Sequence, residues 1–155
     1  MTTLRKEWVV SFARQALSDL NAREILSANN ASKCHRLHFL QMAAEKLCKA
    51  YLIKSQTGHD GNFTTHAVIK RHLKTIARYY GCRSVGVFAN EIEVLSPACR
   101  DGGVRQDNTE YPWLSATGKV IAPCEWSFPN LDDRHRSIVE LIKLIKTASE
   151  DCIKF

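Results

Sequence analysis

The feature that most constrains the fold of this chain is an apolar side chain at every third or fourth position, repeated over five segments. The last segment is the clearest, with Ile138, Leu141 and Ile145 on one side and charged residues on the other. This spacing places such side chains on one face of an α-helix. No segment shows the alternation typical of a half-buried strand. The sequence therefore predicts an all-α fold, an antiparallel bundle of about five helices in a single domain covering residues 1–155.

Capping and turn residues place the ends of these helices. Ser, Thr, Asn and Asp are the expected N-caps, and Asn29–Asn30, Gly81 and Pro97 are the expected stops. The predicted helices are Thr3–Ala28, a second from Ser32 through Tyr51, a third from Thr64 or Thr65 to Tyr80, a fourth over 84–95, and a closing helix within 130–155 capped by Asn130 or Asp132.

Residues 98–129 do not fit the helical pattern. This stretch holds three of the four prolines, two tryptophans and the pair Gly102-Gly103. A long structureless loop is uncommon inside a compact domain, whereas aromatic residues favour packing. We therefore expect an ordered arm lying across the bundle before the last helix, with room for a short helix. In the run Glu110-Tyr111-Pro112-Trp113, the aromatic rings either anchor the arm or stack on a base.

The charge balance is basic, with 22 Lys and Arg against 16 Asp and Glu, a net charge of +6. Four of the cations, Lys70, Arg71, Lys74 and Arg78, lie within one predicted helix. Such a cluster is either a solvated helix face or a contact for a polyanion. The longest apolar runs are too short for a membrane span, and the N-terminus lacks the pattern of a signal peptide. The expected location is the cytoplasm, without membrane contact.

Six cysteines are spread along the chain with no Cys-x-x-Cys pair. Structural zinc sites normally need such close pairs of ligands. We interpret the cysteines as free and mostly buried thiols, with a disulfide or metal role as the alternative. His35 and His38 share a helix face, but no third ligand is evident. The sequence therefore predicts no metal site and no cofactor.

Three short motifs occur in order along the first half of the chain. They are Phe12-Ala13-Arg14-Gln15-Ala16-Leu17-Ser18-Asp19-Leu20-Asn21-Ala22, then Ala43-Ala44-Glu45-Lys46-Leu47-Cys48-Lys49-Ala50, and then Thr65-His66. In order and separation they resemble the HEPN superfamily (higher eukaryotes and prokaryotes nucleotide-binding domains) over roughly residues 8–76. Glu45 and Lys49 are expected on the polar side of their helix, as an ordinary i, i+4 pair.

The resemblance implies a small helical bundle that forms a homodimer. It also implies a prokaryotic stress, defence or toxin–antitoxin setting, often beside a nucleotidyltransferase-like protein partner. Active members of the family cut RNA without a metal, using an Arg followed by four to six residues and then a His. In that motif, Arg stabilises phosphate charge and His transfers a proton.

This chain lacks that motif, since no Arg is followed by a His at that separation. The nearest substitute starts at Arg105 and reaches Glu110 and Tyr111. The first hypothesis is a non-catalytic module that binds RNA, a nucleotide or a protein through Arg100, Arg105, Tyr111 and the basic third helix. The alternative is a metal-independent ribonuclease in which Arg105 holds phosphate and Glu110, Tyr111 or His66 replaces the missing His. The first hypothesis is favoured because it requires only a positive surface. A purely structural dimer is a third possibility.

Overall fold

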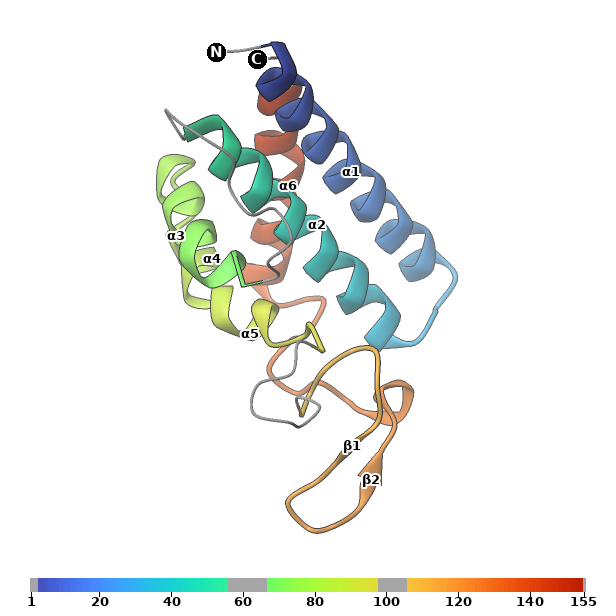
Figure 1. Ribbon diagram of the computed structural model, residues 1–155. Helices are drawn as coiled ribbons and strands as arrows, with labels where there is room; N and C mark the ends of the chain where they lie inside the picture. The colour runs from blue at the N-terminus through green and yellow to red at the C-terminus, as the bar shows by residue number, and fades with distance from the viewer. Residues whose placement is uncertain (1–2, 56–66, 98–105, 155) are drawn as a thin grey trace.

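The structure, a computed structural model, describes residues 3–55, 67–97 and 106–154. Within these ranges its regular secondary structure is almost all helical, which confirms the predicted all-α class (Figure 1). The α-helices are α1 (Thr3–Ala28), α2 (Lys33–Ser55), α3 (Ile69–Tyr79), α4 (Arg83–Val87), α5 (Ala89–Glu93) and α6 (Arg136–Ile153). The arm adds strands β1 (Trp113–Leu114) and β2 (Val120–Ile121) and the 3-10 helix η1 (Pro123–Glu125).

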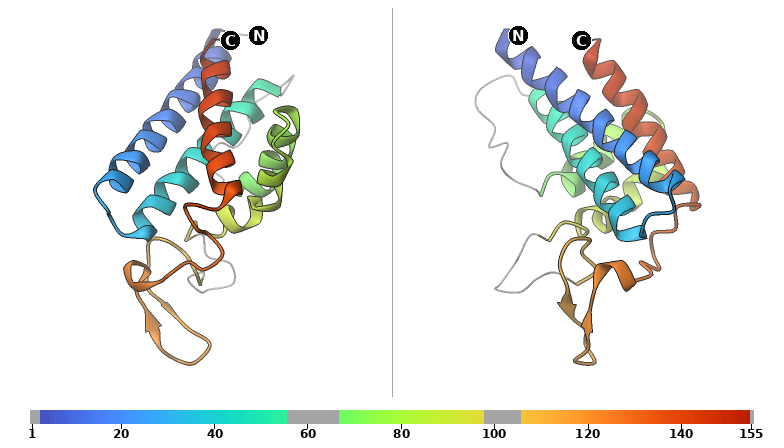
Figure 2. Two further views of the ribbon diagram at one scale, coloured as in Figure 1. Left: turned by 180° about the vertical axis from the view of Figure 1, so that it is seen from behind. Right: turned by 90° about the vertical axis from the view of Figure 1, so that its right-hand side faces the viewer.

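The long helices α1, α2 and α6 form the body of the bundle, and α3, α4 and α5 cover one side of it (Figures 1 and 2). α1 begins and α6 ends at the same end of the bundle, and the hairpin lies at the opposite end. Leucine and isoleucine side chains from α2, α3, α5 and α6 fill the main core, among them Leu40, Leu47, Leu73, Ile92 and Leu141. No helix in the described ranges is long and apolar enough to span a membrane.

The sequence places Trp8, Phe12, Ala16 and Leu20 on the apolar stripe of α1, flanked by Val9, Ala13 and Leu17. The structure buries Ala16 and Leu20 of this stripe, but it also buries Val9 and Ala13 and leaves Trp8 45% exposed, so the buried face is shifted toward the flank. Small side chains on this seam let α1 lie close to α2, and these two helices pack together more extensively than any other pair in the described structure. The helix stop at Asn30 is confirmed, since this residue has a positive φ of 54°.

Two charged pairs lie inside the bundle, and for one of them, Glu45 and Lys49, the sequence had predicted the polar, solvent-facing side of the helix. Lys49 Nζ is 2.7 Å from Glu45 Oε1, and these residues are 6% and 3% exposed. The expectation of a polar-side pair was therefore wrong. Lys46 Nζ likewise lies 2.7 Å from Asp19 Oδ2 and joins α2 to α1. A buried charge is tolerated when it is paired, and both pairs meet this condition.

The third helix begins later than predicted. Residues 67–68 form a turn and α3 starts at Ile69, so the start at Thr64 or Thr65 was wrong; those two residues lie outside the described ranges. The first turn is capped from another element, because the backbone N–H of Lys70 donates to Glu93 Oε2 at 2.8 Å. The predicted stop at Gly81 is confirmed by its positive φ of 72°.

The predicted fourth helix is two short helices, α4 and α5, separated at Phe88. The break coincides with a tight backbone bond from Phe88 N–H to the Val85 carbonyl, at 3.1 Å. Gly86 precedes it, at a point where α4 approaches α3 closely. A Cβ on Gly86 would lie 3.4 Å from Lys74 Cγ and 3.6 Å from Lys74 Cα. The second short helix ends at Glu93 rather than at Leu95.

The N-cap of the last helix is His135, not Asn130 or Asp132. Its Nδ1 accepts a hydrogen bond from the backbone N–H of Ser137 at 3.3 Å. Asp132 caps a different turn, because its carboxylate accepts from the Arg134 N–H at 2.8 Å. Histidine lies outside the usual N-cap set, so sequence rules do not select it.

The described part of the arm contains a small antiparallel hairpin that the helical reading had not foreseen. Trp113 pairs with Ile121 and Leu114 with Val120. The hairpin projects from one end of the bundle instead of lying across it (Figures 1 and 2). Trp113 is 6% exposed and its ring meets Trp126 edge-on at 6.0 Å. The ring contact of Trp113 thus lies within the arm, whereas Phe128, which is 3% exposed, is the aromatic residue of the arm that is buried in the main core.

Five cysteines lie in the described ranges and all are free thiols, as predicted. Three of them, Cys34, Cys48 and Cys152, are buried. Burial raises the pKa of the Cys48 thiol, and the carboxylates of Glu45 and Glu93 add to the effect. This thiol is therefore neutral and unreactive in the folded chain.

Leu47→Ala tests the central position of α2. The side chain is fully buried, so its truncation leaves a cavity and should lower the free energy of unfolding by about 2–5 kcal/mol. Denaturation in urea, followed by circular dichroism, measures the change. The control is Leu4→Ala on α1, where the side chain is 64% exposed. Equal effects of the two substitutions would contradict the described core.

Candidate nucleic-acid interface

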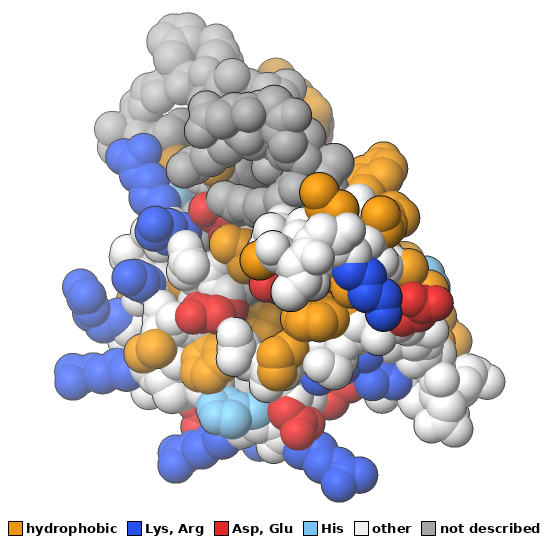
Figure 3. All heavy atoms as spheres, turned by 90° about the horizontal axis from the view of Figure 1, so that it is seen from below, with side chains coloured by type: hydrophobic (Ala, Val, Ile, Leu, Met, Phe, Trp, Pro, Cys, Tyr) orange, Lys and Arg blue, Asp and Glu red, His pale blue; other side chains and the backbone are white. Residues whose placement is uncertain are grey.

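The four basic residues singled out on the third helix form one exposed stripe on α3. Ile69, Leu73, Ile76 and Ala77 face the core. The remaining positions place Lys70, Arg71, Lys74 and Arg78 together in solvent, because residues four apart lie on the same side of a helix. Lys and Arg side chains protrude from the flank of the bundle on which α3 and α4 lie (Figure 3).

No carboxylate within the described ranges forms an ion pair with any of these four cations. The contrast with Lys46 and Lys49 on α2 is clear, because both of those ammonium groups are paired inside the bundle. The stripe on α3 therefore presents positive charge to solvent, which is the property that a polyanion recognises.

Glu110 and Tyr111 follow a turn that Asn108 holds. The fully buried Asn108 accepts hydrogen bonds at Oδ1 from the N–H groups of Glu110 and Tyr111, at 2.9 and 2.7 Å. Its amide also donates to the Tyr111 carbonyl at 2.9 Å. Thr109 secures the turn to the bundle through its N–H, which donates to the Leu95 carbonyl at 3.1 Å. Tyr111 is 55% exposed, so its ring faces solvent at a fixed position.

Glu110 meets a histidine that the sequence reasoning did not connect with it. His38 Nδ1, on α2, lies 3.3 Å from Glu110 Oε1. The two side chains are 26% and 35% exposed, so the pair is accessible from solvent. The two residues are too far apart in the sequence for helical periodicity to relate them. They meet because the arm returns to α2.

Three predicted site residues, His66, Arg100 and Arg105, lie outside the described residues. Of the others, the structure brings Glu110 and Tyr111 together in one turn beside His38. It places the α3 stripe on the flank of the bundle and this turn in the arm (Figure 1). The interface thus has two described parts, a basic helix and a polar turn.

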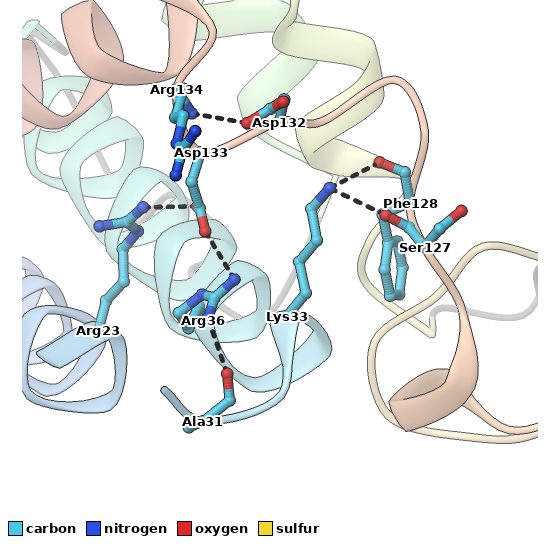
Figure 4. Close-up of polar contacts among 9 residues, drawn as sticks. All are labelled: Arg23, Ala31, Lys33, Arg36, Ser127, Phe128, Asp132, Asp133 and Arg134. Atoms are coloured by element: carbon cyan, nitrogen blue, oxygen red, sulfur yellow. Dashed lines mark hydrogen bonds and ion pairs between the residues drawn. The ribbon is translucent and has the colours of Figure 1, made fainter. Parts of the chain in front are cut away.

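A second basic cluster, not foreseen from the sequence, lies between α1, α2 and the segment before α6 (Figure 4). The carboxylate of Asp133 bridges two guanidinium groups, at 2.7 Å from Arg23 Nη2 and 2.9 Å from Arg36 Nη2. Arg23 is 6% exposed. Both guanidinium groups of this cluster share one carboxylate, and the cluster holds three segments together.

Three tyrosine rings and two lysines line a pocket of about 540 Å³ at the ends of α2, α3 and α6. Tyr80 donates to Asp151 Oδ2 at 2.9 Å, and its hydroxyl oxygen lies 2.6 Å from that of Tyr51. Burial raises the pKa of Tyr51 to about 12, and burial and these hydrogen bonds raise the pKa of Tyr80 further. Both hydroxyls stay protonated at neutral pH and are unsuited to act as a base.

Comparisons of the chain with protein-family models, with curated proteins and with solved structures found no match.

Asp133→Asn tests the bridging carboxylate. Removal of the charge leaves Arg23 and Arg36 partly buried without a counterion, which should cost about 1–3 kcal/mol of unfolding free energy. Denaturant unfolding measures the loss. The matched control is Asp132→Asn, the same chemical change at the exposed neighbouring residue. A loss for Asp132→Asn as large as that for Asp133→Asn would contradict the assignment.

Proposed function

We propose that this chain is a HEPN-like helical module that binds RNA, with the α3 stripe as the main contact for phosphate groups. The observation that carries the proposal is the exposure of four cations on one face of α3, with no ion pair to a described carboxylate. Lys70, Lys74 and Arg78 are spaced by one helical turn each, so they span about 12 Å. Three cations at this spacing fit successive phosphates of one nucleic-acid strand.

The exposed ring of Tyr111 supports the same function. Base stacking on an aromatic side chain is tolerant of sequence and suits single-stranded RNA. The HEPN resemblance adds a homodimer, a cytoplasmic prokaryotic stress or toxin–antitoxin setting, and a nucleotidyltransferase-like protein partner to the proposal. In a dimer the two α3 stripes would double the number of phosphate contacts and steepen the salt dependence.

The double variant Lys70→Ala/Lys74→Ala tests the stripe. RNA binding should weaken, because two phosphate contacts are lost. The slope of log K against log salt concentration should fall by about 0.7 for each contact. Fluorescence anisotropy with a labelled single-stranded RNA, over a series of salt concentrations, measures both quantities.

The matched control is Lys143→Ala/Lys146→Ala, which removes two exposed lysines from α6 and changes the net charge equally. Equal weakening by the two double variants would mean that only overall charge matters, and the stripe would lose its role. Absence of RNA binding by the native chain at low salt would refute the proposed function.

A second candidate function, metal-independent RNA cleavage, is favoured by the contact between His38 and Glu110. A neutral imidazole can take the proton from the 2′-hydroxyl of RNA, whose oxygen then attacks the adjacent phosphorus. A carboxylate beside the imidazole orients the ring and stabilises the imidazolium that forms. In this proposal His38 is the base and Glu110 positions it, in place of the histidine missing from the family motif.

His38→Ala tests this second function. With a mixed RNA panel in excess chelator, cleavage by the native chain should fall by about 10²–10⁴ in the variant, because a general base is lost. Binding, measured separately, should remain. His35→Ala removes an exposed histidine one turn earlier on the same helix and serves as the control. If the native chain leaves the RNA intact, this second function is excluded and only the binding function remains. If His38→Ala still cleaves RNA, His38 is not the base.

A further inference from the structure

Two cysteines that are distant in sequence lie at the junction between α2 and the arm. Cys34 is in the first turn of α2 and is 2% exposed, whereas Cys124 is exposed in η1. Residues of η1 and α2 come within 8 Å of one another, measured between Cα atoms. Burial raises the pKa of the Cys34 thiol, and the charge of Cys124 adds to this effect. The two thiols are therefore electrostatic neighbours, one sheltered and one accessible.

The segments that carry the two thiols are held against each other by hydrogen bonds. Lys33, adjacent to Cys34, donates from Nζ to the carbonyl of Ser127 at 2.9 Å and to that of Phe128 at 3.1 Å (Figure 4). The Phe128 side chain is 3% exposed and packs in the main core. The start of α2 is thus tied to the chain three and four residues beyond Cys124.

The same face of α2 makes a second contact with the arm. Cys34 and His38 are four residues apart, so their side chains leave the helix on the same side. His38 meets Glu110 of the arm at 3.3 Å. A covalent link at Cys34 would therefore act one helical turn away from the contact between His38 and Glu110.

We propose that Cys34 and Cys124 are a redox-modification site, at which a reversible disulfide ties the arm to α2. The oxidant is a low-molecular-weight disulfide such as oxidised glutathione. The Cys124 thiolate attacks one sulfur of the oxidant, forms a mixed disulfide and releases one thiolate. The Cys34 thiolate then attacks the Cys124 sulfur, forms the protein disulfide and releases the second thiolate. The two cysteines are oxidised and the reagent is reduced to two thiols, because the two protons lost by the cysteines are taken up by the two released thiolates.

The order of the two steps follows from exposure. Cys124 is accessible to a bulky reagent, and Cys34 is not. The formation of a disulfide needs Cα atoms about 4.4–6.8 Å apart. Because residues of η1 already lie against α2, the bond would join two segments that the fold places side by side. Once closed, the bond would hold the arm in the position that places Glu110 at His38.

Oxidation of the full chain with excess glutathione disulfide, followed by mass spectrometry, tests the inference. The intact chain should lose the mass of two hydrogen atoms, and a non-reducing digest should contain a peptide that links Cys34 to Cys124. Dithiothreitol should reverse both changes. Cys34→Ser should stop at the first step, with one glutathione attached to Cys124, and Cys124→Ser should form no link at Cys34.

Cys82→Ser is the matched control, since it removes a half-buried thiol from another part of the fold and should leave the link intact. Three outcomes would overturn the inference. In the native chain, Cys124 could keep its glutathione, it could fail to react with glutathione disulfide at all, or it could form a disulfide with a cysteine other than Cys34. These outcomes are independent of RNA binding, so the proposed function and the redox site stand or fall separately.

Discussion

The packing of α1 against α2 depends on charges that water does not reach. Each helix places one carboxylate at the contact, Asp19 on α1 and Glu45 on α2, and each carboxylate has a lysine at 2.7 Å. A glutamine four residues earlier in the same helix donates to the second oxygen, Gln15 to Asp19 and Gln41 to Glu45. Each carboxylate thus has an ammonium group beside one oxygen and accepts a hydrogen bond from a glutamine at the other, and such pairing is what makes charge tolerable in a bundle interior. Because Lys46 on α2 pairs with Asp19 on α1, a rotation of either helix would separate these two groups, so this pair fixes the relative orientation of the helices.

The helices were predictable because their signal is local. Apolar spacing located α1, α2 and α6, and Asn30 and Gly81 ended their helices through positive φ angles. Which face of α1 is buried was harder to predict from the sequence, because Trp8 and Val9 are adjacent and both apolar. The choice between them depends on how closely α2 approaches, and the small Ala13 and Ala16 allow that approach.

The features that sequence reasoning missed all depend on groups far away along the chain. Glu45 and Lys49 were predicted as an ordinary surface pair, because the sequence around them does not indicate that α1 covers them. Glu93 substitutes for an N-cap side chain at the start of α3. His38 contacts Glu110 only because the arm returns to α2. Sequence patterns of helical spacing do not relate residues so far apart in the chain. The basic residues of α3 were identified correctly as a cluster, and their shared exposed face follows from the burial of Leu73 and Ile76 on the opposite side.

Both ends of the described chain lie at one end of the bundle, and the hairpin lies at the other (Figures 1 and 2). This arrangement has a practical consequence for the handling of the protein. A tag or a linker joined to either terminus can anchor the chain to a sensor surface while the arm, Tyr111 and the pair of His38 and Glu110 point into solution. An immobilised chain would therefore meet a nucleic acid with its arm unobstructed, whichever terminus is attached.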